Sequence, residues 1–528
     1  MDVETDSPRR RDNIKPPLFA SVLKNLYNYG MTILIKNIQL LDGAGRPAVK
    51  ADVLVKNDKI SAVGSFPKYR ADEIIDGMGA YLAPGFIDIN TDSDHYLTLF
   101  SNPSQKDFLL QGVTTIIGGQ CGASLAPLLY GSLESIRQWA DINRMNVNWQ
   151  TVGEFLKTLS KRPLGVNFGT LVGHTTVRQA LVGETDRELT QNEMKVFASV
   201  LEKAMKDGAF GFSTGLGYSQ AHHTTYGEVK ELVGMIKKFK GLYATHLRHR
   251  KEGLLSAVNE TINIAKENSV SVLINHFQPL VGFEKDYEQA LELISENANA
   301  ADVYFDVYPF NESVVTVDVF LPRWAQSGDR ELMLKNIQTP EIREKIVAEL
   351  PKIKGEEIVI VNAPAKEFLN GKTLKEFSFN RILPLIEGLL NLMEDASFRA
   401  VVSYKNISPK KITEFLSHER SIIASNSASF GDVVRFKPER SYKTFTRFLE
   451  MVEKEKIMPL ETAVRKITSL PAAKLGLEDR GVVSGGYAAD LVLFRDAEIR
   501  EVILNGRRVV KEGQFQNILA GKVLKHES

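Results

Sequence analysis

Short apolar runs alternate with longer amphipathic segments between Gly85 and about Asn426. The longer segments carry an apolar residue at every third or fourth position, as in residues 193–207, 227–239 and 252–267. This spacing is typical of helices that bury one face, and short apolar runs are typical of buried parallel strands. The alternation therefore predicts repeated β-α units around a parallel sheet, an α/β fold.

Eight of the apolar runs have the length and composition of buried strands. They are residues 85–89, 113–119, 166–173, 209–214, 242–246, 272–276, 301–308 and 421–426. Eight parallel strands with helices between them predict a closed (β/α)8 barrel of the TIM type, to which we assign residues 81–480. More than a hundred residues separate the last two runs. A connection of that length predicts an inserted, lid-like subdomain at about residues 310–396.

Strand-like alternation occurs again at both ends of the chain. Two such segments near the beginning are joined by Asn57-Asp58, and two near the end are joined by Asn505-Gly506. Asn-Gly strongly favours a two-residue hairpin turn. We expect residues 31–80 and 481–515 to pack together as one small β domain beside the barrel.

The composition is that of an ordinary globular protein, with 43% hydrophobic and 25% charged residues and no apolar run long enough to span a membrane. The formal net charge is +1, which favours a small-molecule partner over nucleic acid or a membrane surface. Cys121 is the single cysteine, and residues 1–30 lack the pattern of a secretory signal. We therefore expect a cytoplasmic protein with a disordered N-terminal extension, in which Met31 is an alternative start. The oligomeric state is left open.

Polar residues gather where the predicted strands end, and in eight-stranded barrels these ends form the active site. They are Asn90, Asp92, Cys121, His174, Ser213, Thr214, His246, His276, Asp306, Tyr308 and Asn426. Three of them, Cys121, His246 and His276, offer the sulfur and nitrogen ligands of a catalytic Zn²⁺ that keeps one position open for water. Each of the three alone would more often be a packing or hydrogen-bonding residue, but together they predict a metal site.

Several longer segments resemble the D-aminoacylase group of the amidohydrolase superfamily. They are residues 111–128 (QGVTTIIGGQCGASLAPL), 208–218 (GAFGFSTGLGY), 243–248 (YATHLR), 274–276 (INH) and 469–494 (SLPAAKLGLEDRGVVSGGYAADLVLF). The resemblance extends over about residues 31–515. It implies that Cys121, His246 and His276 hold zinc and that zinc-activated water attacks the amide carbonyl of an N-acyl-D-amino acid.

The chain departs from this family at positions that carry chemistry. The family has His-x-His after its first strand, where this chain has Asn90-Thr91-Asp92. Asn90 and Asp92 offer only oxygen ligands, so we expect one zinc and a weak second site at most. Asn426 stands where the family has a catalytic aspartate, and a carboxamide cannot act as a base near neutral pH. Losing such a group costs about 10²- to 10⁴-fold in rate.

Substrate contacts are also implied by the resemblance. Tyr308 and Ser313 match positions near the substrate, Gln278 replaces an expected lysine, and Lys437-Pro438-Glu439 stands in place of a family His-Pro-Arg. His174 matches a family Gly-His segment, with the alternative that it only orders the barrel mouth by hydrogen bonding.

Other polar residues near the strand ends are assigned smaller roles. Asp432 and Lys437 are candidates for giving a proton to the leaving amine. His95 and Asp94 are not expected to be ligands, because they lie beyond the strand end, and His222-His223 is expected to be solvated.

Three functions compete on the sequence. The leading hypothesis is a single-zinc hydrolase of linear amide bonds. The second is a catalytically impaired binding or assembly module, which the residues Asn90, Asp92 and Asn426 motivate. The third is a cyclic-amide hydrolase, which is disfavoured because such barrels commonly have a lysine on the fourth strand, and here that strand ends in Phe212-Ser213-Thr214.

Overall fold

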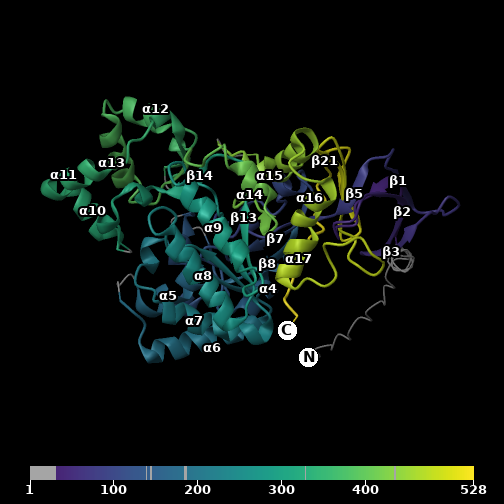
Figure 1. Cartoon of the computed structure of the whole chain (residues 1–528), viewed down its shortest axis with the longest axis horizontal. Helices are drawn as coiled ribbons and strands as arrows, with labels where there is room; N and C mark the ends of the chain where they lie inside the picture. The colour runs from purple at the N-terminus through teal and green to yellow at the C-terminus, as the bar shows by residue number, and fades with distance from the viewer. Residues whose placement is uncertain are drawn as a thin grey trace, which may run out of the picture.

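Figure 1 shows the computed structural model of the chain, in which the barrel lies between a β-sheet at one end and a largely helical insertion at the other. The structure describes residues 31–527 except 132, 138, 143–144, 184–186, 328, 365 and 433–435. The predicted N-terminal extension lies outside the described residues. No helix in the described part of the chain is long and apolar enough to cross a bilayer.

All eight predicted barrel strands are present. They are β6 (Phe86–Asp88), β7 (Val113–Gly118), β8 (Asn167–Thr170) with its continuation β9 (Val172–Gly173), β10 (Gly211–Gly215), β11 (Leu242–His246), β12 (Val272–Ile274), β13 (Val303–Val307) and β17 (Ser421–Ile423). Two runs of parallel strands form the ring. The first is β6-β7-β8, and the second is β9-β10-β11-β12-β13-β17. The ring closes between β17 and β6, where the backbone N–H of Asn426 donates to the backbone carbonyl oxygen of Asn90. This confirms the (β/α)8 barrel.

Helices cover the outside of the barrel. They are α4 (Val152–Leu159), α5 (His174–Val182), α6 (Gln191–Asp207), α7 (Tyr226–Ile236), α8 (Leu254–Asn268), α9 (Glu284–Glu296), α14 (Ile412–Ser417), α15 (Arg440–Glu450), α16 (Leu460–Ile467) and α17 (Ser469–Leu475). Two single-turn helices, α2 (Thr98–Ser101) and α3 (Lys106–Leu109), precede β7. In α6 the apolar residues predicted to face the sheet, among them Phe197 and Leu201, are buried. That helix begins with a capping box between Thr190 and Glu193 and ends at Gly208 in a left-handed conformation.

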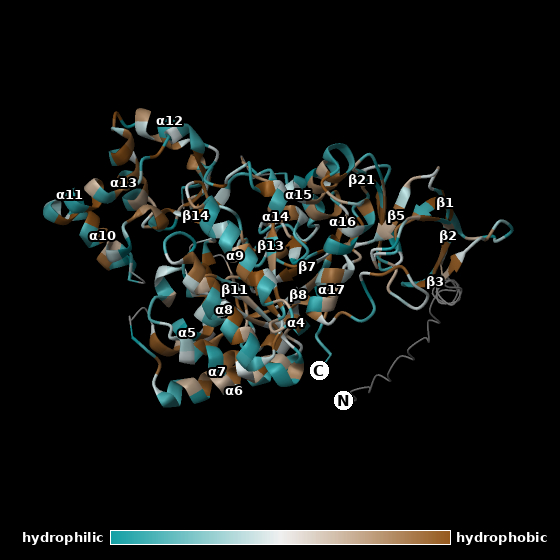
Figure 2. Ribbon diagram, in the orientation of Figure 1, coloured by the Kyte–Doolittle hydropathy of each residue, from teal (hydrophilic) through white to brown (hydrophobic). Residues whose placement is uncertain are grey.

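The inside of the barrel is packed with apolar side chains. One buried cluster combines Ile87, Ile117, Leu242, Leu273 and Ile422 from five strands around the ring. Side chains alternate along a strand, so residues of this set point inward while their neighbours contact the helices. Figure 2 shows the hydrophobic residues on the strands and on the sheet-facing sides of the helices. Space for chemistry therefore exists only at the strand ends.

The two ends of the chain share one sheet. Its strands are β1 (Thr32–Leu40), β2 (Val49–Lys56), β3 (Lys59–Gly64), β4 (Glu73–Asp76), β5 (Tyr81–Pro84), β18 (Leu491–Arg495), β19 (Glu498–Leu504), β20 (Arg507–Lys511) and β21 (Gln514–Phe515). β5 pairs with β18 in antiparallel fashion and so joins the N-terminal strands to the C-terminal ones. The prediction of a small β domain built from both ends is confirmed, and the sheet also takes in β5, which we had assigned to the barrel.

Both predicted two-residue turns are present in this sheet. Asn57-Asp58 joins β2 to β3, and Asn505-Gly506 joins β19 to β20. Gly506 has a φ of 72°, and a Cβ atom placed there would lie 1.6 Å from the carbonyl oxygen of Asn57. Only glycine fits this position, because the two turns touch.

The insertion follows β13, as predicted. It contains a three-stranded antiparallel sheet of β14 (Ser313–Thr316), β16 (Val401–Tyr404) and β15 (Ile358–Asn362), together with α10 (Arg330–Gln338), α11 (Pro340–Glu349), α12 (Leu374–Phe379) and α13 (Leu385–Asp395). It has a hydrophobic cluster of its own. Because β16 belongs to its sheet, the insertion extends past the predicted residue 396. Asn362 donates to the carbonyl oxygen of Trp139 at 2.6 Å, which ties the insertion to the barrel mouth.

Candidate metal centre and active-site pocket

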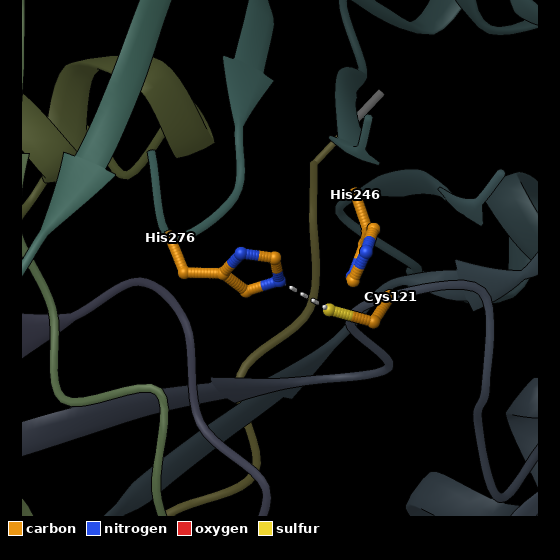
Figure 3. Close-up of side chains that lie close together, drawn as sticks. All are labelled: Cys121, His246 and His276. Carbon is orange, nitrogen blue, oxygen red and sulfur yellow. Dashed lines mark hydrogen bonds between the residues drawn. The ribbon is translucent and has the colours of Figure 1, made fainter. Parts of the chain in front are cut away.

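Cys121, His246 and His276 lie together at the C-terminal ends of β7, β11 and β12 (Figure 3). Their ligand atoms all lie within 4.8 Å of one another. The Sγ atom of Cys121 is 3.5 Å from Nε2 of His276, and the centres of the His246 and His276 rings are 4.5 Å apart. The structure thus brings together the three residues that the sequence proposed as zinc ligands.

The backbone at this site is unusual. Cys121, His276 and Asn426 have φ values of 51°, 37° and 46°, in the left-handed region that residues other than glycine rarely adopt. Each lies two or three residues beyond the end of a barrel strand, where the turn aims the side chain into the mouth instead of continuing the strand. Such strain is characteristic of functional sites.

The electrostatic state of the cluster suits a metal ion. Burial lowers the pKa of His246 to about 3 and the pKa of His276 well below its usual range. Both imidazoles are therefore neutral at ordinary pH and keep a free lone pair, and the Nδ1 atoms of both have no hydrogen-bond partner among the described residues. Burial raises the pKa of the Cys121 thiol, so this thiol needs a nearby cation to ionise. One sulfur and two neutral imidazoles fit Zn²⁺.

Asn90 and Asp92, the other proposed metal ligands, are engaged elsewhere. Asn90 Nδ2 donates to Oδ2 of Asp306 at 3.0 Å, and Oδ1 of Asp306 accepts the backbone N–H of His276 at 2.8 Å. Burial raises the pKa of Asp306 to about 7. Asp92 Oδ1 lies 3.1 Å from Nδ1 of His95. Asp92 is not part of the three-residue cluster, and Oδ1 of Asn90 has no hydrogen-bond partner among the described residues.

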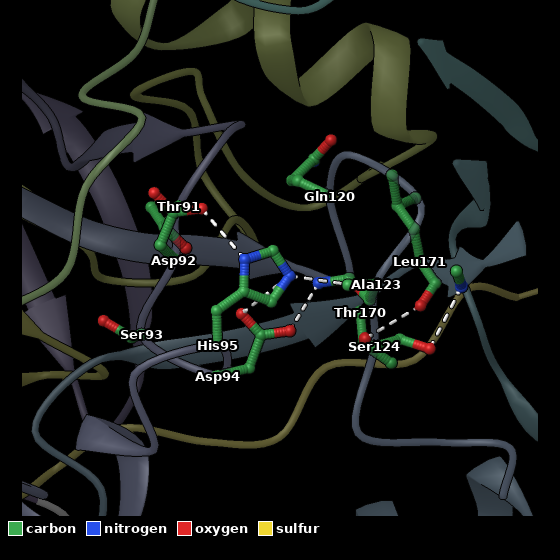
Figure 4. A network of polar contacts seen from close by, with 12 residues as sticks. Thr91, Asp92, Ser93, Asp94, His95, Gln120, Ala123, Ser124, Thr170 and Leu171 are labelled. Atoms are coloured by element: carbon green, nitrogen blue, oxygen red, sulfur yellow. Dashed lines mark hydrogen bonds and ion pairs between the residues drawn. The ribbon is translucent and has the colours of Figure 1, made fainter. Parts of the chain in front are cut away.

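His95 is held on both sides (Figure 4). Its Nδ1 faces Asp92, and its Nε2 lies 3.0 Å from the carbonyl oxygen of Ala123. Burial alone would lower the pKa of His95, but the carboxylates of Asp94 and Asp92 raise it to about 9. His95 is therefore a charged imidazolium at neutral pH, which donates from Nε2 to Ala123 and forms an ion pair with Asp92 through Nδ1. His95 was not expected to be a metal ligand and is not one of the three cluster residues, but it lines the pocket because the chain turns directly after Asp92.

A cavity of about 560 Å³ opens above the cluster. Barrel residues form its floor, and Val314, Thr316, Phe320 and Arg323 of the insertion form part of its wall. Tyr308, Ser313 and Asn426, all proposed from the sequence, line it. This size and this mixture of apolar and polar side chains suit a small organic substrate.

The sequence prediction missed the most notable cation of the pocket, Arg440. This residue begins α15, is 2% exposed, and places its guanidinium 5.0 Å from the centre of the Tyr308 ring. Its Nε and Nη1 atoms have no hydrogen-bond partner within the described chain. The resemblance sets Lys437-Pro438-Glu439 against a family His-Pro-Arg, and in the structure the next residue, Arg440, reaches the pocket.

Two proposed substrate contacts do not line the pocket. His174 Nε2 bonds Oε1 of Glu228 at 2.7 Å and its ring packs against Phe197 and Phe212, so the hydrogen-bonding alternative describes it better. Gln278 points behind the wall, where its Nε2 donates to the carbonyl oxygen of Tyr308 at 3.2 Å.

The two proposed proton donors lie outside the pocket as well. Asp432 is 71% exposed and pairs with Lys106, and Lys437 binds Asp107 at 2.9 Å. Of the pair His222-His223, His222 lines the pocket. The structure also places Tyr218 and Arg250 there, which the sequence gave no reason to select.

Comparison with known proteins identifies the family. Residues 433–510 match the sequence model of the "Amidohydrolase family". The chain is 30% identical over 513 residues to the D-aminoacylase of Alcaligenes xylosoxydans xylosoxydans, covering 93% of this chain and 97% of the relative. It is also 30% identical over 475 residues to the N-acyl-D-aspartate deacylase of the same organism, covering 89% and 86%.

A solved structure agrees. A D-aminoacylase structure, described as showing one-metal activation and second-metal attenuation of a binuclear metal centre, superimposes with a TM-score of 0.78 at 28% identity, covering 93% of this chain and 99% of the other. The chain therefore belongs to the D-aminoacylase group of the amidohydrolase superfamily. Its relatives are metal-dependent hydrolases that act on amide bonds of small molecules.

Proposed function

We propose that this protein hydrolyses the linear amide bond of N-acyl-D-amino acids with a single zinc ion held by Cys121, His246 and His276. The observation that carries the proposal is the meeting of these three side chains at the floor of the pocket. Zinc held by three protein ligands activates water for attack on a carbonyl carbon. The relatives named D-aminoacylase and N-acyl-D-aspartate deacylase support this substrate class.

A single metal is favoured by what the neighbouring residues do. Asn90 uses its amide on Asp306, and Asp92 uses one oxygen on His95. The atoms that remain for a second metal, Oδ1 of Asn90 and the second oxygen of Asp92, are oxygen ligands, which bind zinc less well than imidazole nitrogens. The description of one-metal activation in the related D-aminoacylase supports the sufficiency of one ion.

Asp92 is our candidate for moving the proton, in place of Asn426. Its carboxylate lines the pocket near Cys121. Burial is the largest cause of the raised pKa of the Cys121 thiol, and the negative charge of Asp92 is the next. One oxygen is fixed by His95, which leaves the other free to take a proton from water and pass it to the leaving nitrogen. His95 is a positioning residue, because its Nε2 is bonded to the carbonyl oxygen of Ala123 and its Nδ1 is paired with Asp92.

Arg440 and Tyr308 are our candidates for holding the α-carboxylate of the substrate. A buried guanidinium without an anionic partner is costly, and a bound carboxylate would satisfy it with two parallel hydrogen bonds. This contact would fix the amide carbonyl over the cluster.

The alternative function is a binding module without catalysis, which Asn426 favours because the family aspartate is missing. The cyclic-amide alternative is not favoured, since β10 ends in Ser213 and Thr214, which bond the carbonyl oxygen of Gly119 and the hydroxyl of Thr245, and offers no lysine there.

One experiment separates these functions. Zinc content is measured in wild type and in the Cys121→Ala and His246→Ala variants, and the same samples are assayed with N-acetyl-D-amino acids and their L-enantiomers. We expect wild type to bind about one zinc per chain and to hydrolyse the D-enantiomers selectively. Both variants should lose the zinc and the hydrolysis together. Bound zinc without hydrolysis would favour the binding module, and failure to bind zinc would contradict the metal-hydrolase proposal.

A further inference from the structure

Two arginines face the pocket from different sides of the cluster. Arg250 follows β11, and Arg440 begins the helix after β17. In the ring the order is β11-β12-β13-β17, so His276 at the end of β12 lies between the two arginines. Arg440 is placed against Tyr308, which follows β13. The proposed function uses only Arg440, which leaves Arg250 unexplained.

Arg250 has little to bind within the described protein. Its Nη2 atom donates to the carbonyl oxygen of His276 at 3.4 Å, a long hydrogen bond to a neutral acceptor. Arg248, two residues earlier, offers a direct comparison, because it forms a two-pronged ion pair with Glu260 at 2.8 and 3.0 Å. Arg250 forms no such ion pair with a carboxylate in the part of the chain that the structure describes.

Arg250 lies beside the metal cluster. Its guanidinium bonds the carbonyl oxygen of His276, and Arg250 lines the same cavity as Tyr308 and Arg440, where the α-carboxylate subsite is assigned. A substrate bound there would have its side chain within reach of Arg250.

More basic than acidic side chains line this pocket, although the whole chain has a formal net charge of only +1. The cations of the lining are Arg248, Arg250, Lys251, Arg323 and Arg440, and the acids are Asp92 and Glu252. Glu260 neutralises Arg248, and His95 offsets Asp92. A balanced chain that concentrates positive charge in one cavity favours an anionic ligand there.

We propose that Arg250 binds a second carboxylate of the substrate, so that the enzyme prefers N-acyl derivatives of acidic D-amino acids over neutral ones. The proposal rests on the proposed function for the position of the α-carboxylate, which Arg440 holds. A carboxylate offers a guanidinium two parallel charge-assisted hydrogen bonds, whereas the carboxamide of the matching neutral side chain offers one neutral acceptor.

The test compares N-acetyl-D-glutamate with N-acetyl-D-glutamine, which have nearly the same shape and differ in side-chain charge. The zinc-loaded full chain is used, and preference is the ratio of kcat/KM where turnover occurs, or of Kd by calorimetry where it does not. We expect wild type to prefer the acid by about 10- to 100-fold, the range of a charge-assisted hydrogen bond. Arg250→Met should reduce the preference below about threefold, and Arg250→Lys should keep part of it.

Lys285→Met is the charge-matched control. Lys285 is an exposed residue of α9 that does not line the pocket. Its loss removes one positive charge and should change the preference by no more than about twofold. Zinc content measured in each variant shows whether Arg250→Met acts on the substrate and not on the metal.

The two proposals fail in different ways. Hydrolysis of both substrates with no preference for the acid, or a preference that survives in Arg250→Met, would overturn the role of Arg250 and leave the proposed function intact. Binding of the acid that depends on Arg250, without hydrolysis of either compound, would support the subsite and contradict the hydrolase.

Discussion

Asp92 Oδ1 lies 3.1 Å from Nδ1 of His95, in a turn that begins directly after the first barrel strand. The other nitrogen of His95 is held by the carbonyl oxygen of Ala123, so the imidazolium ring is fixed from both sides. Asp92 is therefore a carboxylate whose geometry is set by an imidazolium.

We predict that Asp92→Asn lowers kcat by about 10²- to 10⁴-fold, the range for loss of a general base, while the protein keeps one zinc. The amide has nearly the same shape but cannot carry the proton. The measurement is steady-state kinetics together with elemental analysis. Glu252→Gln, a carboxylate at the exposed rim of the same pocket, is the control and should leave kcat within about twofold. Loss of zinc in Asp92→Asn would show instead that Asp92 is a metal ligand.

Zinc should stabilise the folded protein through the cluster. A ligand at about 100 times its Kd stabilises the native state by about 2.7 kcal/mol, so added zinc should raise Tm in chelator-treated wild type. Cys121→Ala should abolish this rise. His222→Ala removes a pocket imidazole outside the cluster and should preserve it. An equal zinc-dependent rise in wild type and Cys121→Ala, followed by differential scanning fluorimetry, would contradict the assigned ligand set.

Arg440 should contribute to substrate binding and not to the metal. Arg440→Met should lower kcat/KM by about 10- to 100-fold, because a charge-assisted contact to the α-carboxylate is lost. Arg447→Met is the matched control on the same helix, since Arg447 is 42% exposed and pairs with Glu450. The comparison is made on N-acetyl-D-amino acids with neutral side chains, so that Arg250 does not contribute. Equal effects of the two substitutions would contradict the role of Arg440.

The fold was largely predictable from the sequence, because buried strands and amphipathic helices follow from local apolar spacing. The three cluster residues were also predictable, since each ends a strand and strand ends meet in a closed barrel. The chain directions after those ends were not predictable. The φ of 37° at His276 turns the backbone, and Gln278 then points toward the carbonyl oxygen of Tyr308 instead of into the pocket.

Arg250, Arg440 and His95 were missed for a related reason. All three lie in loops or at a helix start, where the orientation of a side chain depends on contacts with distant elements. His95 stacks on Trp139 with ring centres 4.7 Å apart, and Arg440 lies over Tyr308. Neither contact has a signature in the local sequence.

The contact between His174 and Glu228 provides the last test. A substitution that breaks this contact shows whether His174 has a structural role or a role in substrate binding. Its partner Glu228 is 6% exposed and also accepts from Nε of Arg178 at 3.2 Å. Burial would raise the pKa of Glu228, but the hydrogen bond from His174 and the charge of Arg178 outweigh it and lower that pKa. A carboxyl whose pKa is lower in the folded state contributes stability above its unfolded pKa, and this stability is lost as the pH falls through the folded value.

We therefore predict that Glu228→Gln lowers the free energy of unfolding at pH 7 by about 3 kcal/mol, the cost of removing one partner of a buried ion pair. The difference from wild type should shrink as the pH falls below about 4, where the wild-type carboxyl also becomes neutral. Urea unfolding at several pH values provides the measurement, with kcat/KM determined on the folded protein. A variant of unchanged stability whose kcat/KM has fallen at least tenfold would place His174 and Glu228 in substrate binding after all.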